Sequence, residues 1–251
     1  VVARPCGAGG PAGAGGRVAT VIVPRRLSGL ARDLVAFALP QRCPACGAEA
    51  GAERLLCAGC HARIPRLSTA LCVRCLAAGR EAVGCLAHPG FVARAAWIYD
   101  ESATLVVHAL KYGERPGLAE ALGEEMARTL PPGYRPDLVL EVPLHRTRRR
   151  ERGYNQAAVL ADSLAAAVAA PRLPGALTRV RATQAQARLG PAERRANLAG
   201  AFRVQRPAAL AGRSVLIVDD VLTTGATLEA CLVPLHVAGA RAMGVALAWA
   251  Q

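Results

Sequence analysis

The stretch Val215-Leu-Ile-Val-Asp-Asp-Val-Leu-Thr-Thr-Gly-Ala-Thr227 is the part of this chain from which the fold can be worked outward. Its first four residues are apolar, which is typical of a strand buried on both faces of a parallel sheet. The pattern predicts that this strand ends at Asp219 and Asp220 and that a hydroxyl-rich loop follows. A helix is expected from Thr227 to Gly239. Backbone N–H groups at the start of such a helix favour an anion.

The loop combines features that suit a phosphate with features that suit a sugar. Gly225 allows the backbone to close tightly around an anion. Asp219 and Asp220 can each accept a hydrogen bond from one of two neighbouring hydroxyls. An anion site beside a diol acceptor indicates a ribose 5-phosphate. An ordinary buried strand and capped helix is the simpler interpretation, but it leaves the paired acids and the three threonines without a role.

The same stretch resembles, along its whole length, the phosphoribosyl-diphosphate (PRPP) signature of type I phosphoribosyltransferases. A contiguous match of this length is far more specific than a lone glycine motif. The resemblance implies that the two acids contact the ribose 2- and 3-hydroxyls and that the threonine-rich loop holds the 5-phosphate. The implied PRPP-binding residues are Asp219, Asp220, Val221, Leu222, Thr223, Thr224, Gly225, Ala226 and Thr227.

The composition limits the classes of protein to which the chain can belong. Its 251 residues allow one main core and a small accessory domain. The formal charge of +13 would suit a polyanion. However, Lys111 is the only lysine among 31 basic residues, a bias that a G- and C-rich genome produces without a partner. Only 4% of residues are aromatic, which leaves little surface for base stacking. Charge alone therefore supports nucleic-acid binding only weakly.

The cysteines indicate metal rather than disulfides. No apolar signal region opens the chain and no run of about 18 uncharged apolar residues occurs, so we expect a cytoplasmic protein without membrane insertion. All nine cysteines except Cys231 lie before residue 86, most of them in Cys-x-x-Cys pairs. In a reducing compartment this arrangement favours zinc.

Two sets of four residues have the spacing of zinc ribbons, in which two Cys-x-x-Cys turns converge on one tetrahedral ion. A pair of redox motifs is the alternative, but no thioredoxin-like pattern surrounds them. In the second set His88 replaces the last cysteine, and it could instead be a bystander. The spacing does not determine whether the pairs combine in sequence or crosswise. The first set is Cys43, Cys46, Cys57 and Cys60, and the second is Cys72, Cys75, Cys85 and His88.

The pattern along the chain predicts four parts. Residues 1–24 are rich in glycine and alanine and are expected to be disordered. Residues 25–42 carry apolar side chains at helical spacing and lead into the cysteine-rich part. Residues 43–90 form the expected zinc-ribbon domain, and residues 91–251 the expected α/β domain.

The α/β part predicts a doubly wound, mainly parallel sheet. Strands are expected at 95–99, 138–144, 215–218 and 242–249, and helices at 105–111, 118–130 and 157–170. The strand at 138–144 continues into a basic loop. Parallel strands in such folds bring the loops at their carboxyl ends together into a site.

Four further motifs, in this order behind a cysteine-rich start, look like the ComF family, and the resemblance covers residues 27–251. Glu141 departs from the family pattern, in which proline or a small residue precedes Val142. It would place a carboxylate near the loop expected to bind pyrophosphate. The motifs are Leu110-Lys111-Tyr112, Val142-Pro143-Leu144-His145, Arg152-Gly153-Tyr154-Asn155-Gln156 and Arg179-x-Arg181-x-Thr183-x-x-Gln186.

This resemblance implies a zinc ribbon joined to a type I phosphoribosyltransferase domain, with structural Zn²⁺ and with Mg²⁺ accompanying PRPP. No residue stands out as a general base. Arginine suits phosphate because its planar fork donates two parallel hydrogen bonds. The residues implied or suited to hold pyrophosphate are Lys111, His145, Arg152, Arg179 and Arg181, with Arg148, Arg149 and Arg150 nearby.

Three functions from different classes remain open at this point. The first is a phosphoribosyltransferase whose acceptor is unknown. The second is a PRPP-responsive factor that handles single-stranded DNA or contacts DNA-uptake proteins, because family members are associated with natural transformation. The third is a zinc-ribbon interaction module on a structural scaffold. The intact acid pair and threonine loop argue against the third.

Overall fold

The computed structural model describes residues 42–50, 55–78, 80–111, 118–145, 150, 153–181 and 190–251. The disorder predicted for residues 1–24 and the helix predicted within residues 25–42 lie outside this part of the chain, apart from Arg42. Among the described helices, none has the length and apolarity that crossing a membrane requires.

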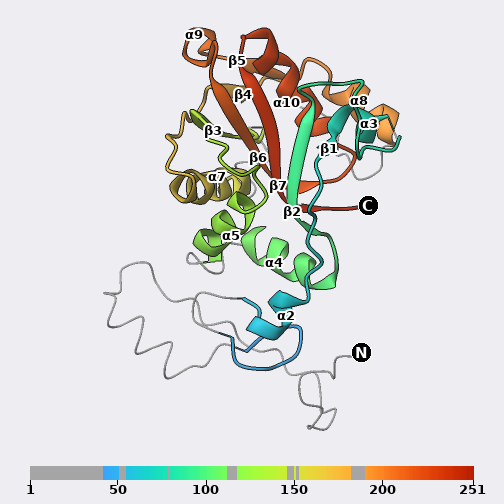
Figure 1. The fold of residues 1–251 in the computed structure, drawn as a ribbon, viewed down its shortest axis with the longest axis vertical. Helices are drawn as coiled ribbons and strands as arrows, with labels where there is room; N and C mark the ends of the chain where they lie inside the picture. Colours follow the sequence, from blue (N-terminus) through green and yellow to red (C-terminus); the bar gives the residue numbers. More distant parts are fainter. Residues whose placement is uncertain are drawn as a thin grey trace.

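A five-stranded sheet forms the centre of the molecule (Figure 1). Strand β6 (Ser214–Leu222) lies between β3 (Leu138–Glu141) and β7 (Arg241–Trp249), and β2 (Val92–Ile98) pairs with the other side of β7. These four strands are parallel to their neighbours. The short β1 (Leu71–Cys72) joins the β2 edge in the antiparallel sense. The predicted doubly wound, mainly parallel sheet is confirmed.

Strand β6 is longer than its apolar core predicts. The sequence pattern placed its end at Asp219 and Asp220, whereas the strand continues to Leu222. The reason is that β7 continues to pair with β6 as far as the last residue of β7. Asp219 lies opposite Ala246, and Leu222 lies opposite Trp249. The two acids are therefore fixed on a hydrogen-bonded strand rather than at a turn.

Strand β3 is shorter than predicted, because it ends at Glu141 instead of Leu144. Val142 still donates a backbone hydrogen bond to the carbonyl of Val218, at 2.8 Å. Pro143 follows, and proline has no N–H with which to continue a ladder. The chain leaves the sheet there, next to the acid pair on β6.

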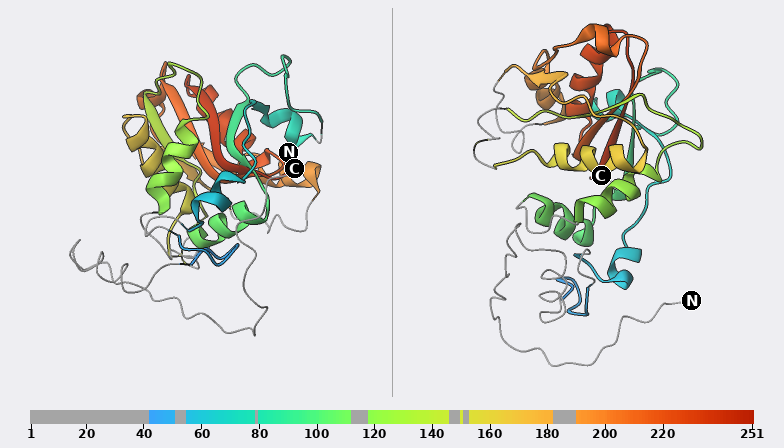
Figure 2. Two further views of the ribbon diagram at one scale, coloured as in Figure 1. Left: turned by 60° about the horizontal axis from the view of Figure 1, so that its bottom comes forward. Right: turned by 90° about the vertical axis from the view of Figure 1, so that its left-hand side faces the viewer.

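Helices cover both faces of the sheet, and the left panel of Figure 2 shows α5 and α7 on one side and α3 on the other. Side chains alternate along β6, so Leu216 and Val218 face the first group while Val215 and Ile217 face the second. The first group contains α4 (Glu101–Lys111), α5 (Leu118–Ala127) and α7 (Gln156–Ala167). The second contains α3 (Val73–Ala77), α8 (Pro191–Leu198) and α10 (Ala226–Val237).

A small two-stranded antiparallel sheet stands apart from the main one. It pairs β4 (Leu177–Arg179) with β5 (Phe202–Val204), and the short helix α9 (Pro207–Leu210) follows. The sequence pattern marked the start of this region only as a segment bearing arginines. Three-residue strands carry too little periodicity to be recognised from sequence.

The two cysteine-rich segments pack on opposite faces of the sheet. Helix α2 (Ala58–Ala62) follows Cys57 and contains Cys60. Both cysteines belong to the core shared with α4, α5 and α7. Cys72 and Cys75 belong to the core shared with α10. Figure 1 shows α3 beside one end of β2 and α2 beyond the other.

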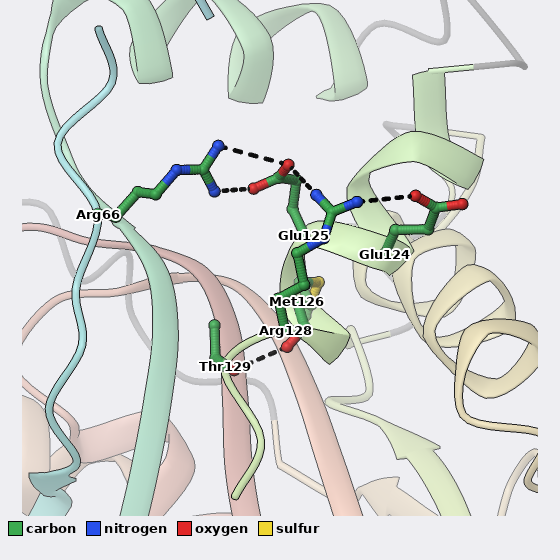
Figure 3. Close-up of polar contacts among 6 residues, drawn as sticks. All are labelled: Arg66, Glu124, Glu125, Met126, Arg128 and Thr129. Carbon is green, nitrogen blue, oxygen red and sulfur yellow. Dashed lines mark hydrogen bonds and ion pairs between the residues drawn. The ribbon is translucent and has the colours of Figure 1, made fainter. Parts of the chain in front are cut away.

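The chain between the two segments runs along the outer edge of β2. Ile98 donates to the carbonyl of Pro65 at 2.7 Å, and Leu67 donates to the carbonyl of Ala96 at 3.2 Å. Arg66 in this segment forms an ion pair with Glu125 of α5, and Arg128 reaches the same carboxylate at 2.6 Å (Figure 3). Glu125 is buried, so two arginines compensate for the loss of its hydration.

Candidate functional site

Asp219 and Asp220 lie at the carboxyl half of β6 and are both partly exposed. The backbone N–H of Asp220 donates to Oδ1 of Asp219 at 3.0 Å, and that of Val221 donates to Oδ1 of Asp220 at 2.8 Å. Each carboxylate therefore keeps oxygen lone pairs for a ligand while the backbone fixes its direction. Although the residue is partly exposed, the carboxyl group of Asp219 is poorly hydrated, and this burial raises its pKa well above the ordinary value. The adjacent charge of Asp220 raises the pKa of Asp219 further.

The loop after β6 turns directly into helix α10. Gly225 is the residue before the helix and has φ = 77°, a left-handed conformation that glycine adopts without strain. As N-cap it supplies no side-chain hydrogen bond to the first turn, which begins at Ala226. The first backbone N–H groups of a helix have no intrahelical acceptor, so this turn can receive an anion. Thr223 is exposed and Thr224 half-buried beside it.

A polar cavity of about 830 Å³ opens where β3 ends, and His145 and Arg179 both line it. The charge of Arg179 partly opposes the effects of burial and of Asp220 that raise the pKa of Asp219, which brings this arginine into the electrostatic surroundings of the acid pair. Its guanidinium carbon lies 5.6 Å from the centre of the Phe202 ring. The structure thus groups two of the residues predicted for pyrophosphate at one side of the acids.

Glu141, the departure from the family pattern, also lines this cavity. Arg172 donates to its carboxylate at 2.7 Å, and the side chains of Arg172 and Glu141 are only 14% and 15% exposed, respectively. Arg172 also reaches Asp162 at 3.1 Å. The carboxylate at Glu141 is therefore neutralised within the fold by an arginine far along the chain.

The motif Gly153-Tyr154-Asn155-Gln156 connects the elements around the site. Oδ1 of Asn155 accepts from the N–H of Ala157 and caps α7, while its Nδ2 donates to the carbonyl of Val142 at 3.0 Å. The hydroxyl of Tyr154 donates to the carbonyl of Leu110 near the end of α4. These side chains join the carboxyl end of β3 to two helices.

The remaining pyrophosphate candidates are distributed differently. Arg181 is exposed and donates to two backbone carbonyls at the end of α8. One is that of Asn197 within the helix, at 3.2 Å, and the other is that of Ala199 just after it, at 3.1 Å. Lys111 is the last residue of α4. Arg150 is exposed. Arg148, Arg149 and Arg152 lie outside the described residues.

The first metal cluster consists of Cys43, Cys46, Cys57 and Cys60, whose sulfur atoms all lie within 4.8 Å of one another. The sulfurs of Cys46 and Cys57 are 3.5 Å apart. Four thiolates around tetrahedral zinc would be separated by about 3.8 Å, so the cluster fits this ion. The N–H of Cys60 donates to the sulfur of Cys57 at 3.4 Å, and Arg63 donates to that of Cys60 at 3.1 Å. Such contacts orient metal ligands.

The second metal cluster consists of Cys72, Cys75, Cys85 and His88, again within 4.8 Å of one another. Nδ1 of His88 faces the sulfurs of Cys72, Cys75 and Cys85 at 3.5, 3.6 and 3.4 Å. Sulfur and nitrogen ligands of one tetrahedral zinc would lie about 3.6 Å apart. The four residues of each set therefore come together in sequence order rather than crosswise, and His88 lies where it could ligate the same ion as the three cysteines.

Several residues that hold the site together were not predicted from the sequence. Glu229 on the first turn of α10 is buried and pairs with Arg195 at 2.7 Å and Arg74 at 3.4 Å. Arg172, described above, pairs with Glu141. A charged residue at an otherwise apolar helix position was the only sequence signal for Glu229, and nothing local identifies its partners.

Comparison with protein families matches two parts of the chain. A double zinc ribbon domain matches residues 34–87, and a phosphoribosyl transferase domain matches residues 152–251. The sheet, the loop after β6 and the two metal clusters thus define a type I phosphoribosyltransferase fold preceded by a double zinc ribbon.

Curated relatives place the chain more narrowly. It is 32% identical to the DNA utilization protein YhgH of Escherichia coli O157:H7 over 74% of this chain and 80% of that protein. It is 39% identical to Competence protein F of Haemophilus influenzae over 38% of this chain and 42% of that protein. The chain belongs to the ComF family. Among solved structures, the allosteric regulatory enzyme of purine biosynthesis matches 56% of this chain and 30% of its own, with 20% identity and a TM-score of 0.38.

Proposed function

We propose that this protein binds PRPP together with Mg²⁺ at the carboxyl end of β6 and transfers the phosphoribosyl group to an acceptor. The observation that carries the proposal is the geometry of the signature. Asp219 and Asp220 are held on the strand with acceptor oxygens directed by backbone N–H groups, and the left-handed Gly225 leads directly into the first turn of α10. Diol acceptors and a helix N-terminus are thereby joined by a short loop.

In this proposal the two carboxylates accept hydrogen bonds from the ribose 2- and 3-hydroxyls, and the Thr223–Thr227 loop holds the 5-phosphate. The bond from C1 to pyrophosphate breaks and a bond from C1 to the acceptor forms, through an oxocarbenium-like transition state. Arg179 and His145, which share the neighbouring cavity, are the described residues suited to the pyrophosphate. Mg²⁺, when bound, supplies charge neutralisation for the leaving group.

We further propose that both cysteine-rich clusters hold structural zinc. Each brings four ligands to tetrahedral spacing and leaves no open position for a substrate, which distinguishes structural from catalytic zinc sites. The sulfur-rich donor sets favour zinc over hard ions such as Mg²⁺.

Calorimetric titration of the zinc-loaded chain with PRPP and Mg²⁺ tests the site. PRPP should bind, and Asp219→Asn with Asp220→Asn should weaken binding by at least about 100-fold, because two charge-assisted hydrogen bonds are lost at about 1.5–3 kcal/mol each. Glu124→Gln is the matched control, since it removes one exposed carboxylate from α5. It should bind PRPP like the parent.

Two outcomes would contradict the proposal in different ways. Equal affinity of the parent and the double variant would remove the acid pair from the site. Binding without release of pyrophosphate across a panel of nucleobases and amines would remove transfer and leave PRPP as a regulatory ligand.

The names of the relatives favour a second candidate function, in DNA utilisation. YhgH is named for DNA utilisation and Competence protein F for competence. We propose on this basis that PRPP binding or turnover serves the handling of DNA. In that case PRPP and single-stranded DNA should influence each other's affinity, which fluorescence anisotropy of a labelled oligonucleotide with and without PRPP would measure.

A further inference from the structure

Helix α3 links the second metal cluster to the loop that we propose binds phosphate. Cys72 is the residue before this helix and Cys75 lies within it, so two of the four cluster residues lie at or within α3. The helix has only five residues. A helix this short has no stability of its own in water. Its shape and position must therefore come from the cluster and from the surfaces on which it packs.

One of the surfaces on which α3 packs is the loop between β6 and α10. A methyl group added at Gly225 would lie 2.7 Å from the carbonyl oxygen of Val73 and 3.0 Å from Cβ of Leu76. The backbone of α3 therefore touches the backbone of the loop, with space only for hydrogen between them. Close backbone packing of this kind leaves little room for either segment to move alone.

An ion pair makes the same connection one turn further along α10. The carboxylate of Glu229, with a side chain only 7% exposed, receives Arg74 of α3 at 3.4 Å and Arg195 of α8 at 2.7 Å. The guanidinium of Arg74 also stacks 3.7 Å above the Phe91 ring. Figure 1 shows α3 beside α8, next to α10. A buried carboxylate between two arginines fixes the three helices relative to one another.

The first metal cluster has no comparable connection within the described residues. Its cysteines pack in the core on the opposite face of the sheet, with α4 and α5. The two clusters thus provide an internal comparison, because only the second lies on the α10 face.

From these contacts we infer that the second metal cluster positions the phosphate-binding loop, so that zinc at Cys72, Cys75, Cys85 and His88 raises the affinity for PRPP. The inference rests on the proposed PRPP site. Zinc orders α3, and α3 holds Gly225 and Glu229 in the geometry that receives the phosphate. Because coupling between two sites is reciprocal, PRPP should strengthen zinc binding at the second cluster by the same factor.

Variants that empty one cluster at a time test this inference. The parent should carry two zinc ions, and Cys85→Ser with His88→Ala, which leaves the α3 sequence intact, should carry one. PRPP affinity of that variant should fall by about 10- to 100-fold, the usual range of coupling between sites. Cys43→Ser with Cys46→Ser also removes one zinc, and it should change PRPP affinity less than about twofold.

A milder variant addresses the case in which loss of the cluster unfolds the region. Arg74→Gln keeps both zinc ions and removes one partner of Glu229. It should weaken PRPP binding by about 3- to 10-fold, as expected for a residue that modulates coupling between two sites without touching either ligand. Hydrogen exchange without any ligand gives a second readout, because amides of residues 225–229 should exchange faster in Arg74→Gln and in the second-cluster variant than in the parent.

The outcomes separate this inference from the proposed function. If the parent binds PRPP, and Arg74→Gln and the variant that empties the second cluster both bind it equally well, the coupling is wrong and the PRPP site stands. If the parent does not bind PRPP, the proposed function fails, and unchanged exchange of residues 225–229 would then reject the structural coupling as well. Equal losses on emptying either cluster would indicate general destabilisation and would also overturn the inference.

Discussion

At the scale of single residues, Asp219 illustrates how a binding group can reduce stability. Its pKa is raised by burial and by the charge of Asp220, so the ionised form is less favourable in the folded chain than in the unfolded chain. The fold is therefore more stable when Asp219 is protonated. This stability is fully present below the unfolded pKa and is lost as pH rises through the folded value.

Asp219→Asn should consequently stabilise the ligand-free protein at neutral pH while weakening PRPP binding. The variant should gain stability because the amide carries no charge that burial disfavours. Urea unfolding of parent and variant with zinc present, at several pH values between 4 and 8, measures it. A gain that does not increase with pH would show that burial of the charge is not its cause. Asp220→Asn provides the comparison, since it should lower the pKa of Asp219.

At the scale of elements, the Arg66–Glu125 pair joins α5 to the segment between the metal clusters (Figure 3). Burial by itself would raise the pKa of Glu125, but the hydrogen bond and charge of Arg66 outweigh it and leave the pKa below its ordinary value. Because the pKa of Glu125 is depressed, the stability that the ionised carboxylate contributes is present above the unfolded pKa. It is lost as pH falls through the folded value.

Arg66→Gln should therefore destabilise the protein at pH 7, and the difference from the parent should shrink at pH values below about 4. The side chain of Arg66 is 49% exposed and Arg128 remains as a partner, so a cost of about 1 kcal/mol is expected. Thermal unfolding of both proteins across pH 3 to 8 measures the difference. Arg128→Gln is the control and should cost less, because Arg128 is 61% exposed. A cost that is independent of pH would exclude the carboxylate as its origin.

At the scale of the whole molecule, the sheet separates two zinc-ribbon clusters that adjoin each other in sequence. The chain crosses from one face to the other along the β2 edge, where β1 pairs with β2. One cluster therefore supports the helices of the α4–α5–α7 face, and the other adjoins the proposed phosphate loop. The ribbons and the sheet form a continuous structure through these contacts.

The net charge of the whole chain also has a testable consequence. If the charge of +13 serves DNA, affinity for a single-stranded oligonucleotide should fall steeply with salt through release of counterions. For about five neutralised phosphates, the decrease between 50 and 200 mM salt would be about 100-fold. Fluorescence anisotropy at both salt concentrations measures it, with an oligonucleotide that has neutral backbone linkages as control. No binding at the lower salt would show that the arginine content reflects genome composition.

Local sequence was sufficient for those features whose determinants are adjacent in the chain. The apolar run of β6, the acids that follow it and the threonine loop occur within one stretch, so the strand, the tight turn at Gly225 and the helix could be placed from their order. Both sets of predicted zinc ligands were recognisable for the same reason, because the two residues of each Cys-x-x-Cys or Cys-x-x-His pair are only three positions apart. The boundaries of β6 and β3 were misplaced, since pairing with neighbouring strands decides where a strand ends.

The remaining features depend on contacts between residues that are distant in sequence. His88 joins the second cluster because the fold brings it to Cys72, and Glu141 is neutralised because Arg172 returns to the edge of β3. Val73 and Gly225, which pack against each other, belong to the zinc-ribbon and the phosphoribosyltransferase parts of the chain. Such contacts form only when the sheet and its helices are assembled. Packing and charge pairing in three dimensions, rather than any local pattern, connect the second metal cluster to the phosphate loop.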